Sequence, residues 1–173
     1  MDDVTKQPLM KKYFTSFSYI YKGILGYIAY IVIAPPWLSA WIHKKRGVKI
    51  DNYKTVYIAP NVALDGNFPE HITIGNHVYI TRGAKIVCHT AFTPLIHQLI
   101  GVEHVVQDVV IDDGAYIGVN AVIMPSVHVG KCAVIGSGAV VTKDVPDYAI
   151  VAGVPAQKIG DVRKLKKKMR LKF

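Results

Sequence analysis

Three histidines and one carboxylate stand close together between residues 87 and 105, and side chains of these types can move protons. His89, His97 and His104 are eight and seven residues apart, and Glu103 directly precedes the last of them. An imidazole can accept a proton and return it near neutral pH, so one histidine can act first as a base and then as an acid. The alternative is a corner histidine that only bonds to the backbone, and the choice depends on the scaffold around it.

The chain on both sides of this segment has a period of six residues. A small or β-branched residue follows four positions after each aliphatic residue of the series Val105, Ile111, Ile117, Ile123, Val129, Ile135 and Val141. A second block with the same spacing contains Ile74, Ile80 and Ile86, and a less regular stretch contains Ile58, Val62, Leu64 and Phe68. This period fits neither an amphipathic helix nor a hairpin sheet. It predicts an all-β coil of short stacked strands, in which each six-residue unit forms one side of a triangular prism.

The interruption of the repeat predicts a loop. We expect an insertion near 89–104 that leaves the coil, and loops carried by a rigid scaffold are common places for reactive groups. The chain therefore divides into an apolar helical segment at 1–50, a coil at 51–160 with this insertion, and a basic tail at 161–173.

The N-terminal segment is apolar but too short in its uninterrupted run, 23–36, to span a bilayer as a helix. Pro35-Pro36 predicts a break between two helices, the second starting at Pro36 and ending near Gly47. Basic clusters stand on both sides, and tyrosines and tryptophans lie between them, which is typical of a segment at a membrane interface. A helix pair packed on the coil or on a partner subunit is the alternative, and we expect residues 1–48 to be separable from the coil.

The net charge of +9 is unevenly distributed. Residues 1–50 carry eight Lys/Arg and two acidic residues, and residues 158–173 carry eight Lys/Arg and one acidic residue. Residues 51–157 carry five Lys/Arg and nine acidic residues. Two basic flanks around an acidic body exclude a uniformly basic nucleic-acid binder and indicate an anionic surface as a partner. Cys88 and Cys132 are too few for a disulfide scaffold and suit a reducing compartment.

Residues 109–159, VVIDDGAYIGVNAVIMPSVHVGKCAVIGSGAVVTKDVPDYAIVAGVPAQKI, resemble the hexapeptide-repeat acyltransferases. Within this family the chain is most similar to sugar O-acetyltransferases of the maltose/galactoside type and their polysaccharide-modifying relatives. Three segments carry this similarity: GSGAVVTKDVP, IVAGVPA and the upstream HITIGNHVYITRGAKIVCHT. The resemblance covers about residues 56–160. It implies a left-handed β-helix, an exception to the usual right-handed crossover, and a homotrimer with active sites between adjacent prisms.

The resemblance also assigns roles to residues. It implies that His89 is the general base and that Glu103 holds its imidazole tautomer. It implies acetyl-CoA as the co-substrate, bound by Val119, Ser137, Thr142 and Lys143, with no metal. Relatives carry arginines after the AGxPA motif where this chain has Gln157 and Gly160, so Lys158 or Arg163 is expected to substitute at the CoA 3′-phosphate.

The resemblance places acceptor-binding polar residues in the early coils, at Asn61 and Asp65, although Asp65-Gly66-Asn67 is also a turn signal. We expect a cytoplasmic acetyltransferase associated with the inner face of the cell membrane. Its acceptor would be the hydroxyl of a sugar in a surface-polysaccharide or lipid-linked intermediate.

Three alternatives remain open. The acceptor could be the amino group of an amino sugar, since the same base and donor would serve. A metal-dependent carbonic anhydrase uses the same coil, but the spacing of His89, His97 and His104 does not reproduce its pattern. A non-catalytic β-helix assembly module is the third, and acetyl-CoA binding would distinguish it.

Overall fold

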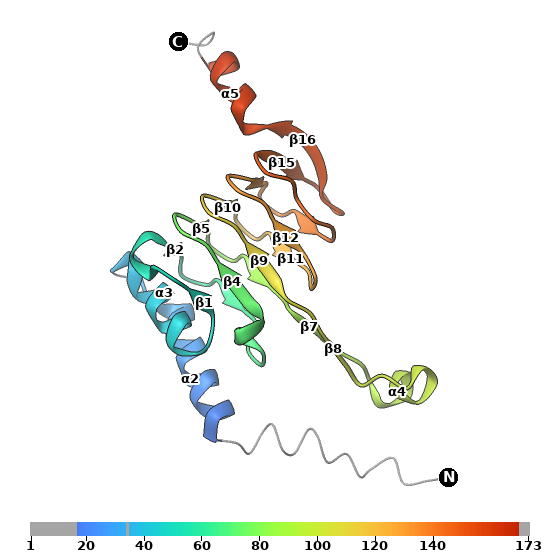
Figure 1. The fold of residues 1–173 in the computed structure, drawn as a ribbon. Coiled ribbons are helices and arrows are strands. Elements are labelled where there is room, and N and C mark those ends of the chain that lie inside the picture. The colour runs from blue at the N-terminus through green and yellow to red at the C-terminus, as the bar shows by residue number, and fades with distance from the viewer. Residues whose placement is uncertain (1–16, 34, 170–173) are drawn as a thin grey trace.

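The computed structural model describes residues 17–33 and 35–169, which form a three-sided parallel β-helix with two helices at its start and one at its end (Figure 1). Face A contains β1 (Lys49–Ile50), β4 (Ile72–Ile74), β9 (Val109–Ile111) and β12 (His128–Val129). Face B contains β2 (Tyr57–Ile58), β5 (Tyr79–Ile80), β10 (Tyr116–Ile117), β13 (Val134–Ile135), β15 (Ala149–Ala152) and β16 (Gln157–Asp161). Face C contains β3 (Ala63–Leu64), β6 (Lys85–Ile86), β11 (Val122–Ile123) and β14 (Val140–Val141).

The six-residue repeat is confirmed by burial and strand register. The strands stack in parallel, as where Ile117 pairs with Ile135 and Ile123 with Val141. Every predicted inward residue from Ile111 to Val141 is at most 1% exposed, and the small residues between them are buried as well. Val105 is the exception. It lies outside the coil, in a hairpin opposite Thr90, so the regular repeat begins after it.

Corners between faces bring successive coils very close together. A Cβ placed on Gly118 would lie 2.6 Å from the carbonyl oxygen of Ile135 and the amide nitrogen of Ser137 in the next coil. At other corners the chain turns through a positive φ, as at Asn61 and Asn120. We call the corner where the chain passes from face C to face A the C–A edge. It consists of residues 65–71, 87–108, 124–127 and 142–145, one segment for each coil.

The predicted proline break is confirmed, because α2 (Phe17–Ile31) and α3 (Pro36–Lys45) are separate helices and Pro36 opens the second. Ala40 of α3 and the following Val48 are buried in the same core as the coil. The helix α3 thus closes the first coil, as in the alternative of a helix pair packed on the coil, and the separability of residues 1–48 stays a prediction. The short 3₁₀ helix at Tyr53–Thr55 lies in contact with α3.

In contrast to α3, α2 exposes most of its apolar side chains. Phe17 is 84% exposed, Ile24 56% and Tyr27 69%. In the described part of the chain, no helix is both long and apolar enough to cross a membrane. The basic pair Lys11-Lys12 lies outside the described residues.

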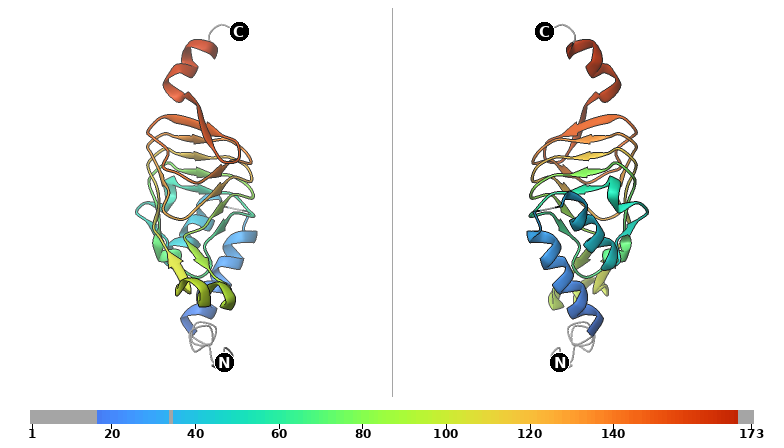
Figure 2. Two further views of the ribbon diagram at one scale, coloured as in Figure 1. Left: turned by 90° about the vertical axis from the view of Figure 1, so that its right-hand side faces the viewer. Right: turned by 90° about the vertical axis from the view of Figure 1, so that its left-hand side faces the viewer.

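The predicted loop is an ordered arm. Strands β7 (His89–Ala91) and β8 (His104–Val106) pair antiparallel, and α4 (Pro94–Ile100) connects them at the tip (Figures 1 and 2). Thr93 caps α4 by accepting a hydrogen bond from the Ile96 amide, and Gly101 ends it at φ 70°. The arm leaves the coil at the C–A edge, and its first residue is His89.

At the other end of the coil, β16 pairs antiparallel with β15 and leads into α5 (Val162–Met169). Figure 1 shows α2 and α5 at opposite ends of the prism. The described parts of the two basic flanks, at α2 and at α5, therefore lie at opposite ends of the coil.

Candidate active site

Asp65 and His89 occupy the C–A edge in two successive coils, and their side chains form a hydrogen bond. Asp65 directly follows β3, and its amide donates to the carbonyl of Ile86 in the coil above at 2.9 Å. His89 follows β6 after a two-residue corner. The Nδ1 of His89 lies 2.5 Å from Oδ2 of Asp65. The Asp65 side chain is 1% exposed and that of His89 is 21% exposed, so the carboxylate is shielded while the ring reaches the surface.

The surroundings of Asp65 keep its carboxylate ionised. Burial acts to raise the pKa of Asp65, but hydrogen bonds from His89 and from the amides of Cys88, Phe68 and Asn67 outweigh it and hold this pKa below its ordinary value. The Cys88 amide donates to Oδ2 at 3.0 Å, and the Asn67 amide donates to Oδ1 at 3.0 Å. A carboxylate surrounded by donors acts as an acceptor toward His89 as well. In the neutral ring the proton therefore resides on Nδ1, and Nε2 carries the lone pair.

Besides Asp65, the His89 ring has a polar and an aromatic neighbour from the turn after β3. The side-chain nitrogen of Asn67 lies 3.4 Å from Nε2, and the ring of Phe68 contacts His89 edge-on with centroids 5.2 Å apart. An imidazole held in this tautomer can take a proton at Nε2 from a hydroxyl or amine, while the Asp65 carboxylate stabilises the imidazolium that forms.

Cys88 lies beside the pair but is not poised as a nucleophile. Its side chain is buried, and its Sγ donates to the carbonyl of Phe68 at 3.1 Å. Burial, followed by the negative charge of Asp65, raises the pKa of the Cys88 thiol well above its ordinary value. Cys88 therefore fills space in the core.

The structure corrects the predicted role of Glu103, because Asp65 is the carboxylate that holds His89. In the arm, His89 pairs with Val106, whereas the carbonyl of Glu103 accepts from the Phe92 amide three residues further out. Three residues of a strand span about 10 Å. The Glu103 carboxylate lies 3.9 Å from Nδ1 of His104.

Asn61 and Asp65 were predicted to bind the acceptor together, and the structure separates them to the two ends of β3. Asn61 stands on the corner before β3, where its amide donates to the carbonyl of Tyr30 in α2 at 2.7 Å. Asp65, predicted to bind the acceptor, contacts the ring of His89 instead. The sequence signal for this was the Leu64-Asp65-Gly66-Asn67 turn, which the structure places directly below His89.

The predicted donor residues lie along two edges that border face C. Val119 and Ser137 stand at the corner between faces B and C, where the Gly138 amide donates to the Val119 carbonyl of the coil below. Thr142 and Lys143 stand on the C–A edge, two coils beyond His89 and roughly 10 Å along the axis at the usual strand spacing. All four are exposed. The C–A edge thus lines up Lys143 with His89, and the contact of these residues with CoA stays a prediction.

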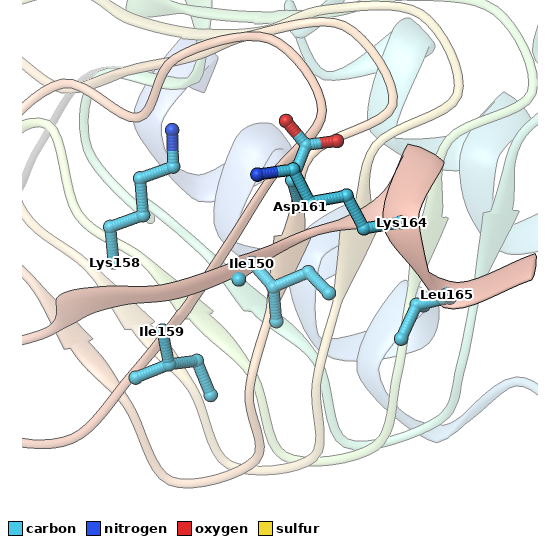
Figure 3. A pocket seen from close by; sticks show the side chains of 7 residues that line it. Ile150, Lys158, Ile159, Asp161, Lys164 and Leu165 are labelled. Atoms are coloured by element: carbon cyan, nitrogen blue, oxygen red, sulfur yellow. The ribbon is translucent and has the colours of Figure 1, made fainter. Parts of the chain in front are cut away.

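Lys158 lies in a hollow at the end of face B. This hollow, of about 640 Å³, is lined by Ile150, Lys158, Ile159, Gly160, Asp161, Lys164 and Leu165. Figure 3 shows the polar ends of Lys158, Asp161 and Lys164 gathered beside the apolar side chains. Face B lies opposite the C–A edge of the prism. In one chain this hollow and His89 are therefore on different sides of the coil.

Arg163, the other predicted phosphate ligand, is already engaged. Its guanidinium forms two hydrogen bonds to Asp161, at 2.9 and 2.6 Å, and lies over the ring of Tyr148 at 4.6 Å. The hydrogen bonds from Arg163 hold the pKa of Asp161 far below its ordinary value. In the described part of the chain, Lys158 forms no ion pair with a carboxylate, in contrast to Arg163.

Residues 108–143 match the family model of the bacterial transferase hexapeptide, six repeats. CapG of Staphylococcus aureus is 34% identical over 119 residues, which are 69% of this chain and 69% of CapG. The chain belongs to the hexapeptide-repeat bacterial transferases. A tetrahydropyridine-dicarboxylate N-acetyltransferase of S. aureus strain JH9 is 55% identical over 51 residues, which are 30% of this hexapeptide-repeat chain and 21% of that enzyme.

A solved galactoside acetyltransferase in complex with coenzyme A has the same fold. It superimposes with a TM-score of 0.63 at 19% identity, covering 94% of each chain. The left-handed β-helix predicted for a hexapeptide-repeat protein is thereby confirmed.

The histidine spacing that suggested a metal-dependent alternative does not form a metal site. His97 lies in α4 and His104 in β8, and His71 and His128 each pair with one carboxylate, Asp108 at 2.7 Å and Asp112 at 2.8 Å. Across residues 17–33 and 35–169, no three His, Cys, Asp or Glu side chains are grouped as metal ligands would be.

Proposed function

We propose that this chain is an acetyl-CoA-dependent acetyltransferase whose acceptor is a sugar hydroxyl, with His89 as the general base. The observation that carries the proposal is the Asp65–His89 pair, in which a buried, ionised carboxylate fixes the proton on Nδ1 and leaves Nε2 as a base. Family membership supports a transferase, and the coenzyme A held by a protein of the same fold supports the donor.

The reaction follows from this geometry in two steps. As Nε2 of His89 takes the proton of the acceptor hydroxyl, the oxygen attacks the thioester carbonyl carbon and a tetrahedral intermediate forms. When that intermediate collapses, the carbon–sulfur bond breaks and the departing thiolate takes the proton back from Nε2. The products are the acetyl ester and free coenzyme A. Asp65 stays ionised throughout and stabilises the transient imidazolium.

An amino-sugar acceptor is the second candidate. The same base can take a proton from an amino group as the amine nitrogen attacks the thioester, and the match to a dicarboxylate N-acetyltransferase shows that N-acylation occurs among similar sequences. That match spans 30% of this chain, whereas the match to CapG spans 69%. We place the hydroxyl acceptor first for this reason.

We further propose that the acceptor is a surface-polysaccharide or lipid-linked intermediate met at the cytoplasmic face of the membrane. The support is the apolar surface of α2 with the neighbouring Trp37 and Trp41, which are 41% and 37% exposed. Lys44 and Lys45 are exposed beside it. Aromatic side chains next to lysines favour the headgroup region of an anionic bilayer. The tail at α5 lies at the opposite end of the prism and would not share this contact.

We also propose a homotrimer. In one chain the C–A edge carries His89 while the hollow with Lys158 opens over face B, so neighbouring prisms could supply the two walls of one site.

The test is transfer of radiolabelled acetyl groups from acetyl-CoA to a panel of acceptors by the purified full chain. The panel contains neutral sugars, amino sugars and lipid-linked saccharides extracted from membranes. Alkaline lability of the product separates an ester from an amide. Label transferred only to amines would replace the hydroxyl acceptor, and no coenzyme A release with any acceptor would overturn the proposal.

A further inference from the structure

We propose that Arg46, which caps the C-terminal end of α3, is a positioning residue for the Asp65–His89 pair, an inference that rests on the proposed function. It assigns to the N-terminal helices a part in catalysis in addition to closing the coil.

The guanidinium of Arg46 holds the backbone from which the Asp65 carboxylate projects. One terminal nitrogen donates to the carbonyl of Asp65 itself at 2.6 Å, and the other donates to the carbonyl of Leu64 at 3.2 Å. Arg46 is 3% exposed, so these bonds are made away from water, where they are stronger than at the surface. The two carbonyls are the last of β3 and the first of the C–A edge.

His43, one turn earlier, fixes the guanidinium from the other side. The nitrogen that bonds Leu64 also lies 3.1 Å from Nδ1 of His43. Because arginine can only donate, Nδ1 of His43 is the acceptor and its ring proton is on Nε2. Burial and then the charge of Arg46 lower the pKa of His43 to about 3, so this imidazole is neutral near pH 7.

Helix α2 covers the same guanidinium with a glycine. A Cβ added to Gly26 would lie 3.2 Å from Cζ of Arg46 and 3.5 Å from Nε, which is too tight unless Arg46 moves. Gly23, one turn away on α2, has no heavy atom within 4 Å of the same added Cβ. The chain thus offers a substitution that presses on Arg46 and a matched one that does not.

The position of these carbonyls matters for two reasons. The hydrogen bond between Asp65 and His89 is short, and the Asp65 carboxylate also accepts hydrogen bonds from the turn that follows it. The amides of Asn67 and Phe68 bond the Asp65 carboxylate from the same turn, at 3.0 and 3.2 Å. A shift of the Asp65 backbone therefore carries the carboxylate away from Nδ1. A misplacement of about 1 Å can cost a catalytic group roughly a hundredfold in rate.

The first experiment compares Arg46→Gln and Arg46→Lys with the full wild-type chain. We expect kcat to fall about 10- to 100-fold in Arg46→Gln and less in Arg46→Lys, with the KM for acetyl-CoA unchanged. The downfield proton resonance of His89 Nδ1–H, assigned with His89→Gln, should weaken or shift upfield in the same order. A role confined to fold stability would lower the melting temperature and leave this resonance and kcat in place.

The second experiment uses Gly26→Ala with Gly23→Ala as its control, since both gain helix propensity and neither removes a polar group. Gly26→Ala should lower kcat several-fold and move the Nδ1–H resonance, while Gly23→Ala keeps both at wild-type values. This pair remains informative if Arg46→Gln does not fold.

The outcomes separate this inference from the proposed function. Folded Arg46 and Gly26 variants with wild-type kcat and an unchanged resonance would overturn the positioning role, while acetyl transfer by the wild type would still stand. A wild-type chain that transfers no acetyl group would end the proposed function. The dependence of the Nδ1–H resonance on Arg46 would then still test the geometry.

Discussion

Nδ1 of His89 lies beside Asp65 and Nε2 lies beside Asn67, and we propose that Nε2 acts as the base. If His89 performs the proton transfer, His89→Ala should lower kcat by about 10²- to 10⁴-fold, the usual contribution of general-base catalysis. The affinity for acetyl-CoA should change little, which calorimetry can measure. His97→Ala is the control, because His97 lies on α4 away from the coil. A fully active His89→Ala chain would refute the assignment.

The two candidate carboxylates can be separated by isosteric substitutions. Asp65→Asn removes the charge that fixes the Nδ1 proton, so we expect kcat to fall at least about tenfold with the ring tautomer no longer defined. Glu103→Gln should stay within about twofold of wild type, because Glu103 contacts His104 in the arm. Steady-state rates of both variants at saturating acetyl-CoA provide the measurement. The reverse order would restore Glu103 as the orienting group.

His43 should make the fold sensitive to acid. In the unfolded chain its pKa is about 6.5, and in the folded chain burial and Arg46 lower this pKa to about 3. The unfolded state then binds a proton that the folded state excludes between these values. The free energy of unfolding should therefore decrease as the pH falls from about 6.5, by up to about 1.4 kcal/mol per pH unit.

Urea titrations between pH 7 and pH 4.5 measure this dependence above the range where Asp65 contributes. The lowered pKa of Asp65 adds stability that is lost only below its ordinary value of 3.8. His43→Gln should flatten the profile, and His77→Gln, an exposed corner substitution, should leave it as in wild type. Equal slopes in all three proteins would contradict the buried neutral state of His43.

At the scale of elements, the regular coils were predictable because the same two positions of every six-residue unit are buried, the aliphatic one and the small one four positions later. Later coils repeat every 18 residues, as from Tyr116 to Val134, whereas the first two coils are offset by 22 from Ala63 to Lys85. The longer early corners shift the stacking, so Asp65 could not be placed under His89 by counting repeats. The arm was predicted as an interruption of the repeat. The antiparallel pairing of β7 with β8 places Glu103 away from the imidazole of His89, and no periodicity in the sequence indicates this pairing.

The surface of α2 and α3 leads to a prediction about membranes. Removing the exposed lysines in Lys44→Gln/Lys45→Gln should weaken binding to vesicles containing phosphatidylglycerol by about fivefold per lysine, since each contributes about 1 kcal/mol near an anionic surface. Co-sedimentation with these vesicles and with pure phosphatidylcholine is the measurement. Lys85→Gln/Lys131→Gln on the coil is the matched control. Equal loss in both pairs would indicate net charge alone, and no binding by wild type would remove the membrane from the proposal.

At the scale of the whole molecule, one prism presents its parts on different sides. The arm and His89 leave the C–A edge, the hollow opens over face B, and the helices that hold Asp65 through Arg46 close one end. A cyclic trimer would bring unlike faces of neighbouring prisms together, which is the geometry of a heterologous ring interface. Such an assembly would make each site depend on two chains.

This arrangement can be tested by mixing inactive chains. If the base comes from one subunit and Lys158 from its neighbour, His89→Ala and Lys158→Glu chains should complement each other when they are refolded together. Random assembly at equal amounts places an intact base opposite an intact Lys158 in roughly one quarter of the sites, so about a quarter of wild-type activity should return. Refolding each variant alone is the control, and sedimentation confirms the trimer. A mixture no more active than its components, or a fully active monomer, would show that each chain builds its site alone.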